Sequence, residues 1–153
     1  MSENLPVVRL LNQCDRRIKG GHLWVYSNEI DHAATPVKNW LPGTLALLQS
    51  ASGQVLGRVY VNPHSLICCR LLTRDGDAEP SSTWFEQRLR QALALREAVY
   101  AKPYYRLVYG DSDGLSGLVV DRFGDYLVAQ LNTAGMDALR EPLLAALIKV
   151  FQP

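Results

Sequence analysis

The first half of the chain alternates short apolar runs with turn-forming residues, a pattern typical of small β structures. Strands are expected where β-branched, aromatic and aliphatic residues cluster between Gly, Pro, Ser and Asn. On this basis residues 7–11, 23–26, 44–49, 55–61 and 67–72 are predicted as strands, and residues 15–19 as one helical turn. Many short strands in so short a stretch favour a small β-barrel or sandwich.

The second half changes to helical spacing after a polar segment at residues 74–82. Thr83 and Glu86 have the spacing of a capping box, which predicts a helix over residues 84–101. Three strands are predicted next, at 105–109, 118–122 and 126–132, and a last helix at 136–151. Pro142 either kinks this last helix or restarts it. The apolar stripe expected on the first helix consists of Phe85, Leu89, Leu93 and Val99.

The polar segment divides the chain into two predicted domains, residues 1–75 and 83–153, joined by a linker at 76–82. A chain of 153 residues that is 48% apolar can bury a core. Its formal net charge of +1 excludes a strongly polybasic nucleic-acid binder. However, residues 1–75 carry eight Lys or Arg against five Asp or Glu, whereas residues 76–153 carry eight against ten. A polyanion-binding surface is therefore expected in the first domain.

The stretch at 16–30 gathers three cations, two consecutive glycines, a histidine and two aromatic residues. Cations neutralise phosphates, glycine lets the backbone approach a ligand, and flat rings stack on bases. A second polar run lies at 62–74, and the alternative for both runs is a solvated surface. Trp24 is favoured as a core residue of its strand. The candidate RNA-binding residues are Arg16, Arg17, Lys19, Gly20, Gly21, His22, Arg58, Asn62, His64, Arg70 and Arg74.

No catalytic, metal or cofactor site is predicted in this chain. Cys14, Cys68 and Cys69 are too few for a disulfide framework, and no four ligands have zinc spacing. Residues 111–117 depart from an EF-hand loop, and their glycines do not match a dinucleotide fingerprint. The N-terminus lacks the features of a signal peptide, and no apolar run reaches the ~20 residues of a membrane span. A cytoplasmic location is therefore expected.

In order along the chain, these motifs resemble those of a known family. The stretch at 16–30, Arg-Arg-Ile-Lys-Gly-Gly-His-Leu-Trp-Val-Tyr-Ser-Asn-Glu-Ile, then Tyr-Val-Asn-Pro-His-Ser at 60–65 and Arg-Leu-Leu-Thr-Arg at 70–74, is similar to the N-terminal PUA domain of bacterial 23S rRNA (cytosine-C5) methyltransferases. Tyr-Arg-Leu-Val at 105–108, Asp-Gly-Leu-Ser-Gly-Leu-Val-Val-Asp-Arg at 113–122 and Gly-Asp at 124–125 resemble that family's small central domain.

The resemblance implies an α+β fold, with a small PUA-type β-barrel and then a small α/β domain of the order strand-helix-strand-strand-helix. It implies that the family's Rossmann-like methyltransferase domain, which binds S-adenosylmethionine and supplies the cysteine nucleophile, is absent from this chain. The chain is then expected to dock 23S rRNA, without catalysis or a cofactor of its own, for an enzyme that makes 5-methylcytosine. The alternatives are a stand-alone RNA-binding module and accessory domains of another RNA-modifying enzyme. The oligomeric state, for which a homodimer is one candidate, stays open.

Overall fold

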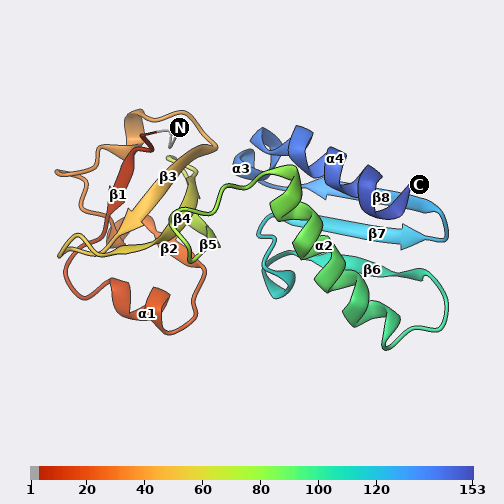
Figure 1. Cartoon of the computed structure of the whole chain (residues 1–153). Helices are drawn as coiled ribbons and strands as arrows, with labels where there is room; N and C mark the ends of the chain where they lie inside the picture. Colours follow the sequence, from red (N-terminus) through yellow and green to blue (C-terminus); the bar gives the residue numbers. More distant parts are fainter. Residues whose placement is uncertain (1–3) are drawn as a thin grey trace. The chain divides into compact units, whose positions relative to one another are not determined.

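The structure, a computed structural model, describes residues 4–153, so the first three residues of the predicted first domain lie outside it. The chain forms two compact units, one ending at Ala78 and the other running from Glu79 to Pro153 (Figure 1). Within the described part, no helix has both the length and the apolar character needed to cross a membrane. Each unit has its own sheet and its own core.

The first unit is a curled five-stranded sheet, the half-barrel form of the β-barrel expected from the sequence. Its strands have the order β1-β3-β4-β5-β2, in which β1 and β3 are parallel and the other pairs antiparallel. An antiparallel bridge between Leu10 and Ile30 joins the chain just beyond the two edge strands. Short helices α1, η1 and η2 lie in the connections. The strands are β1 (Val7–Arg9), β2 (Trp24–Tyr26), β3 (Thr44–Gln49), β4 (Val55–Val61) and β5 (Ile67–Thr73), and the helices are α1 (Asp15–Lys19), η1 (Ser27–Glu29) and η2 (Val37–Asn39).

The core of this unit corrects the prediction for Trp24. Trp24 lies opposite Arg70 of β5 and is only half-buried, whereas Val25, opposite Cys69, is completely buried. The inward residue of β2 is therefore the small Val25. Gly57 in β4 has a positive φ of 146°, and a Cβ there would lie 2.1 Å from the Thr73 carbonyl oxygen, so only glycine fits between β4 and β5.

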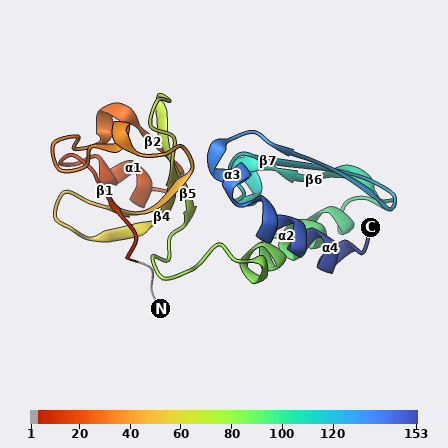
Figure 2. The same cartoon turned by 90° about the horizontal axis from the view of Figure 1, so that it is seen from above.

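The second unit is a three-stranded antiparallel sheet, of order β6-β7-β8, covered on one face by helices (Figure 2). Helices α2 and α4 pack on each other, and α2 also packs on β6. The order strand-helix-strand-strand-helix is therefore wrong, because a helix opens the unit and three strands follow it. The elements are α2 (Ser82–Glu97), β6 (Tyr104–Tyr109), η3 (Gly110–Asp113), β7 (Leu118–Phe123), β8 (Tyr126–Leu131), α3 (Ala134–Ala138) and α4 (Arg140–Phe151).

The ends of these helices differ from the sequence prediction. The cap of α2 is Ser81, whose hydroxyl accepts the Trp84 N–H at 3.3 Å, and not Thr83. Because α2 ends at Glu97, Val99 lies beyond it and is 74% exposed, so its place in the apolar stripe is wrong. Pro142 lies in the first turn of α4, separated from α3 by Leu139. Of the two alternatives, the chain restarts as a new helix there, where a missing N–H costs no intrahelical bond.

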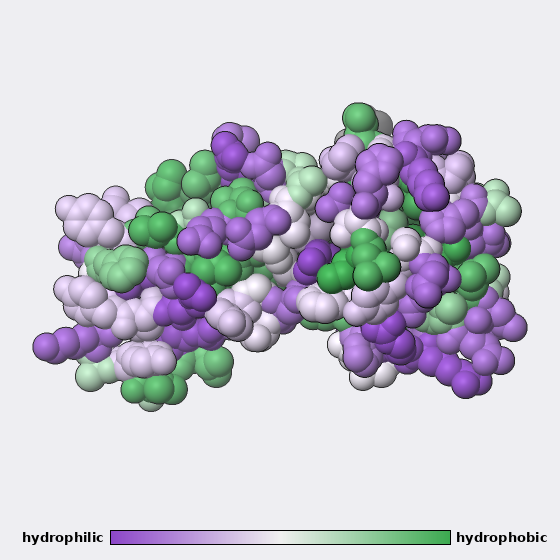
Figure 3. Space-filling model, turned by 180° about the vertical axis from the view of Figure 1, so that it is seen from behind, coloured by the Kyte–Doolittle hydropathy of each residue, from purple (hydrophilic) through white to green (hydrophobic). Residues whose placement is uncertain are grey.

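The opposite face of the second sheet is not covered by the helices of its own unit. Tyr104, Phe123 and Tyr126 form one cross-strand row on it, and they are 64%, 52% and 78% exposed. The next row on this face holds Arg106 and Asp121, which form an ion pair. Seen from behind in Figure 3, the second unit has pale and green side chains interspersed with purple ones.

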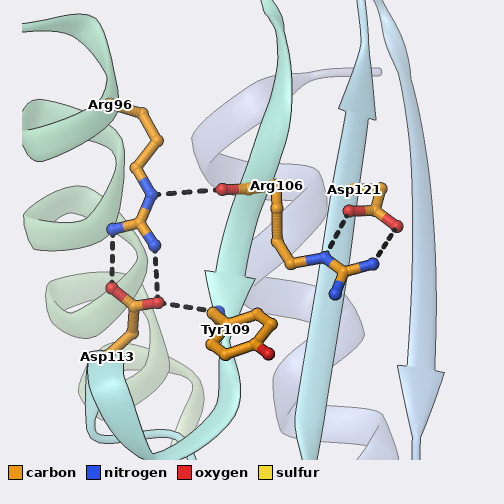
Figure 4. A network of polar contacts seen from close by, with 5 residues as sticks. All are labelled: Arg96, Arg106, Tyr109, Asp113 and Asp121. Carbon is orange, nitrogen blue, oxygen red and sulfur yellow. Dashed lines mark hydrogen bonds and ion pairs between the residues drawn. The ribbon is translucent and has the colours of Figure 1, made fainter. Parts of the chain in front are cut away.

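A largely buried ion pair fixes α2 to the connection between β6 and β7 (Figure 4). The Arg96 guanidinium donates to both carboxylate oxygens of Asp113, each at 2.7 Å, and its Nε donates to the carbonyl oxygen of Arg106. Asp113 also accepts the backbone N–H of Tyr109 at 2.7 Å. The Asp113 side chain is only 6% exposed, so these bonds are shielded from water.

Replacing Asp113 with Ala should therefore destabilise the second unit strongly. The change leaves the Arg96 guanidinium shielded and without its carboxylate, and the free energy of unfolding should fall by about 3 kcal/mol. Urea unfolding followed by circular dichroism measures this loss. The control is Asp137→Ala, which removes a carboxylate from an exposed ion pair with Arg140 and should leave the unfolding midpoint unchanged. Equal shifts for the two variants would contradict the structural role of the pair.

The division after Ala78 predicts where a protease cuts the native chain. Arg74 is held by backbone carbonyl oxygens, whereas Asp77 is exposed just before the start of the second unit. A protease that cuts on the N-terminal side of aspartate should cut first at Asp77 and leave two folded pieces, and trypsin should spare Arg74. Mass spectrometry of the early fragments identifies the site. Early cleavage inside either unit, with residues 75–81 intact, would contradict this division.

Candidate nucleic-acid interface

The basic residues near the N-terminus lie on and just after α1, a helix of five residues. The Gly20 N–H donates to the Arg16 carbonyl oxygen at 2.9 Å, and the His22 N–H donates to that of Arg17 at 3.0 Å. Gly21 has a φ of 109°, which a residue with a Cβ rarely adopts. Ile18, on the inner side, is only 2% exposed and anchors the turn in the core. We call residues 15–22 the basic turn.

The cations of the basic turn have different partners. The Arg17 guanidinium bonds to the Glu29 carboxylate at 2.9 Å and lies 5.0 Å from the centre of the Tyr26 ring. The Lys19 ammonium pairs with Asp15 at 2.6 Å, and this hydrogen bond lowers the pKa of the Asp15 carboxyl. The Arg16 side chain is exposed and makes no ion pair or hydrogen bond within residues 4–153. The turn therefore presents three cations, two of them in partly exposed pairs that a phosphate can replace.

Arg74 belongs to the same place, although it lies more than fifty residues further along the chain. It follows β5, and its guanidinium donates to the Ile18 carbonyl oxygen at 2.6 Å and, more weakly, to that of His22 at 3.4 Å. The Ile18 carbonyl oxygen, near the end of α1, also accepts the Gly21 N–H, and His22 lies just beyond the helix. Arg74 therefore holds the basic turn against the sheet.

Four further candidates lie apart from the turn. Arg70 lies over the Trp24 ring at 5.2 Å, in the middle of β5. The Arg58 Nε donates to the Gly76 carbonyl oxygen at 2.7 Å, so this side chain is directed to the segment after β5. Asn62 and His64 lie in the β4–β5 hairpin, at the opposite end of β5 from Arg74 and about 20 Å away along the strand. The fold therefore gathers Arg16, Arg17, Lys19, Gly20, Gly21, His22 and Arg74, and leaves Arg58, Asn62, His64 and Arg70 outside that group.

Two residues that complete this surface, Tyr26 and Glu29, were missed by the sequence analysis. One carboxylate oxygen of Glu29 accepts the Tyr26 N–H at 2.8 Å while the other binds Arg17. Glu29 therefore orients the Arg17 guanidinium over the Tyr26 ring. The sequence feature that could have indicated Glu29 is Ser-Asn-Glu, directly after β2. These residues form a polar turn, which brings the Glu29 carboxylate back to the end of the strand.

The cysteines form no reactive site. Cys68 and Cys69 are both completely buried, and Cys14 is partly buried. A hydrogen bond with Cys68, together with burial, raises the pKa of the Cys69 thiol well above its ordinary value, and burial also raises the pKa of Cys14. Among the described residues, no three His, Cys, Asp or Glu side chains gather as metal ligands.

Comparison with known protein families identifies the first unit. The family model described as a PUA-like domain matches residues 8–74. Residues 8–74 form a PUA-like domain.

Curated relatives named "Ribosomal RNA large subunit methyltransferase I" extend the similarity into the second unit. The relative from Aliivibrio fischeri is 32% identical over 140 residues, which cover 90% of this chain and 35% of the relative. Those from Cronobacter sakazakii and Klebsiella pneumoniae are 36% and 33% identical and match 82% and 99% of the chain. The resemblance stated from the motifs is confirmed.

The chain spans about a third of the length of these relatives. Two solved structures share the fold. A candidate SAM-dependent methyltransferase from Streptococcus mutans has a TM-score of 0.80 at 19% identity, covering 97% of this chain and 38% of that protein. A second candidate methyltransferase, solved in complex with SAH, has a TM-score of 0.77 at 20% identity, covering 96% of this chain and 37% of that protein. At this identity the likeness concerns the fold of the matched part.

The burial of the thiols predicts their order of reaction. In the native chain a thiol reagent at neutral pH should modify Cys14 first and slowly, and should leave Cys68 and Cys69 unmodified. All three thiols should react at once in denaturant. Peptide mass spectrometry after timed labelling gives the order. Rapid labelling of Cys69 in the native chain would contradict its position in the core.

Proposed function

We propose that this chain is the RNA-docking and spacer portion of a SAM-dependent rRNA methyltransferase, and that its PUA-like domain binds the RNA. The basic turn with Arg74 carries this proposal, because it combines exposed cations, a glycine turn that a backbone phosphate can approach and an anchored position on the sheet. The relatives named as rRNA large subunit methyltransferases support the same substrate class. By the motif resemblance, the substrate is 23S rRNA and the product 5-methylcytosine.

In this proposal the PUA-like domain supplies position and not chemistry. Ionic contacts of Arg16, Arg17 and Lys19 with phosphates would set the register of the RNA without choosing the base. A methyltransferase must reach a base that is out of its stack, and a held RNA brings that base within reach. The enzyme would act in the cytoplasm, where its RNA substrate is found.

The second unit does not fit S-adenosylmethionine. Its glycines at 110, 114 and 117 surround η3, which is a single short turn between two strands and not the start of a long helix. The space beside Gly114 is filled, since a Cβ there would lie 2.5 Å from an Arg88 guanidinium nitrogen. We therefore derive no catalytic step from these residues, and assign cofactor binding to the part of the longer relatives that this chain does not match.

The proposal predicts a specific change in the salt dependence of RNA binding. Each phosphate neutralised on single-stranded RNA adds about 0.7 to the slope of log affinity against log salt. The triple variant Arg16→Ala, Arg17→Ala and Lys19→Ala should therefore lower that slope by about two. Its thermal unfolding should change little, because these cations are exposed or partly exposed. Fluorescence anisotropy with a labelled 23S rRNA fragment over a salt series measures the slope.

The matched control replaces three exposed cations of the second unit, Arg90, Arg140 and Lys149, with Ala. It removes the same net charge from the whole chain but leaves the basic turn intact. The slope for this control should stay close to that of the unmodified chain. A control that lowers the slope as much as the basic-turn variant would show that RNA is bound elsewhere.

A further inference from the structure

A small pocket in the second unit has no part in the RNA contacts described above. It has a volume of about 230 Å³ and lies where the end of α2 meets β6 and β7. Five of its residues can contact a ligand through charged or aromatic groups: Glu97, Tyr100, Lys102, Tyr105 and Arg122. The volume is below the roughly 300–1,000 Å³ of pockets for drug-sized ligands, so it suits a ligand of one nucleotide or less.

Arg122 is the partly buried cation of the pocket. It lies in β7 opposite Tyr105, on the helix-facing side of the sheet. Its guanidinium donates to the Tyr105 hydroxyl at 3.0 Å and to the Gly124 carbonyl oxygen at 3.1 Å, and it lies 5.4 Å from the centre of the Phe151 ring. Both hydrogen-bond acceptors are neutral.

Arg106 of β6, the other arginine of this sheet, pairs with Asp121, and Arg96 of α2 pairs with Asp113. Arg122 has no ion pair within residues 4–153, although it is partly buried. A guanidinium that is fixed in place beside a pocket, with N–H groups to spare, is suited to a bidentate anion such as a phosphate. Lys102, exposed on the pocket wall, adds a second positive charge.

The aromatic wall of the pocket can bind a flat ring. Tyr100 stacks on Tyr105 with ring centres 5.5 Å apart and planes inclined by 28°. Tyr105 is buried, whereas Tyr100 is 51% exposed, so a further ring can extend the stack on the outer side. The Tyr105 hydroxyl accepts from Arg122, which leaves its O–H to donate to a ligand oxygen. The Glu97 carboxylate can accept from a ribose hydroxyl or a base amino group.

We propose that this pocket binds one nucleotide, with its phosphate on Arg122 and Lys102 and its base stacked on Tyr100. The inference rests on the proposed RNA-docking function, to which it adds a second contact point. The same chemistry could come from a nucleotide within an RNA strand or from a free nucleoside monophosphate. Both carry a phosphate, a ribose and a base, so the test includes both.

The test is a titration of the whole chain, labelled with ¹⁵N, with cytidine 5′-monophosphate. Amide resonances of residues 97–105 and of Arg122 should shift and saturate. Cytidine without its phosphate should bind about tenfold more weakly, since it cannot use the charged contacts. A short single-stranded RNA that shifts the same amides at lower concentration places the nucleotide in an RNA strand, whereas shifts with the monophosphate alone identify a free nucleotide.

Variants separate the ligand contacts from structural roles. Arg122→Gln and Lys102→Gln should each weaken binding of the monophosphate, by about tenfold for Arg122. Tyr100→Leu should weaken it about fivefold, and Tyr100→Phe, which keeps the ring, should restore it. Arg140→Gln, an exposed arginine outside the pocket, is the control and should bind normally. Lys102 and Tyr100 are exposed, so these variants report on the pocket even if Arg122→Gln unfolds.

Three results would overturn the proposal: no saturable shift, equal binding of cytidine and its monophosphate, or unchanged affinity in both Lys102→Gln and Tyr100→Leu. The monophosphate titration contains no RNA and does not involve the basic turn. A basic-turn variant that has lost RNA binding should therefore still bind the monophosphate normally. Failure of the pocket and failure of the proposed RNA-docking function are thus separate observations.

Discussion

The presentation of the basic turn depends on the hydrogen bonds from Arg74 to the backbone of α1. A helix of five residues is too short to be stable in water by itself. The guanidinium of Arg74, which follows β5, donates to the carbonyl oxygens of Ile18 and His22 and so ties this turn to the sheet. Burial of Ile18 secures the other side of the turn. The cations before and after Ile18 are therefore held at fixed positions on the sheet, although each of them is exposed or only partly buried.

The two units use their arginines in different ways. In the PUA-like domain, Arg16 and Arg17 lie at the surface, where the surrounding water and salt screen them and where phosphates can compete for them. In the second unit, Arg96 is engaged with a shielded carboxylate and joins a helix to the sheet. Arg122 is fixed like Arg96 but has only neutral acceptors. This difference distinguishes an arginine that holds the fold together from one that is placed to receive an anion.

The strands could be predicted from the sequence because each has a strong local pattern. Runs such as Val55–Val61 are rich in β-branched residues and are bounded by turn residues on both sides. Local patterns were less informative about where a helix begins and about which face of a strand points to the core. Ser81 and Thr83 are both suitable helix caps, and in the structure the hydroxyl of Ser81 accepts the Trp84 N–H. Trp24 and Val25 could each face the core from the sequence alone, and in the structure it is Val25 that is buried.

The roles of the candidate site residues were harder to predict, because their partners are distant in the sequence. The sequence identifies Arg74 and Arg58 as basic, but their acceptors belong to α1 and to the segment after β5. A pattern of charges cannot distinguish a cation that binds a ligand from one that binds its own backbone. The basic turn could be predicted because its residues are consecutive. The pocket could not, since Tyr100 and Lys102 lie between α2 and β6 whereas Arg122 comes from β7.

The most direct test of RNA docking by the PUA-like domain is a map of contacts between the whole chain and RNA. Ultraviolet cross-linking to a 23S rRNA fragment, followed by mass spectrometry of the linked peptides, gives this map without substitutions. The account predicts cross-links on the peptides that carry residues 16–26 and Arg74. Cross-links that fall on the β4–β5 hairpin or the second unit, with none on residues 16–26, would contradict it.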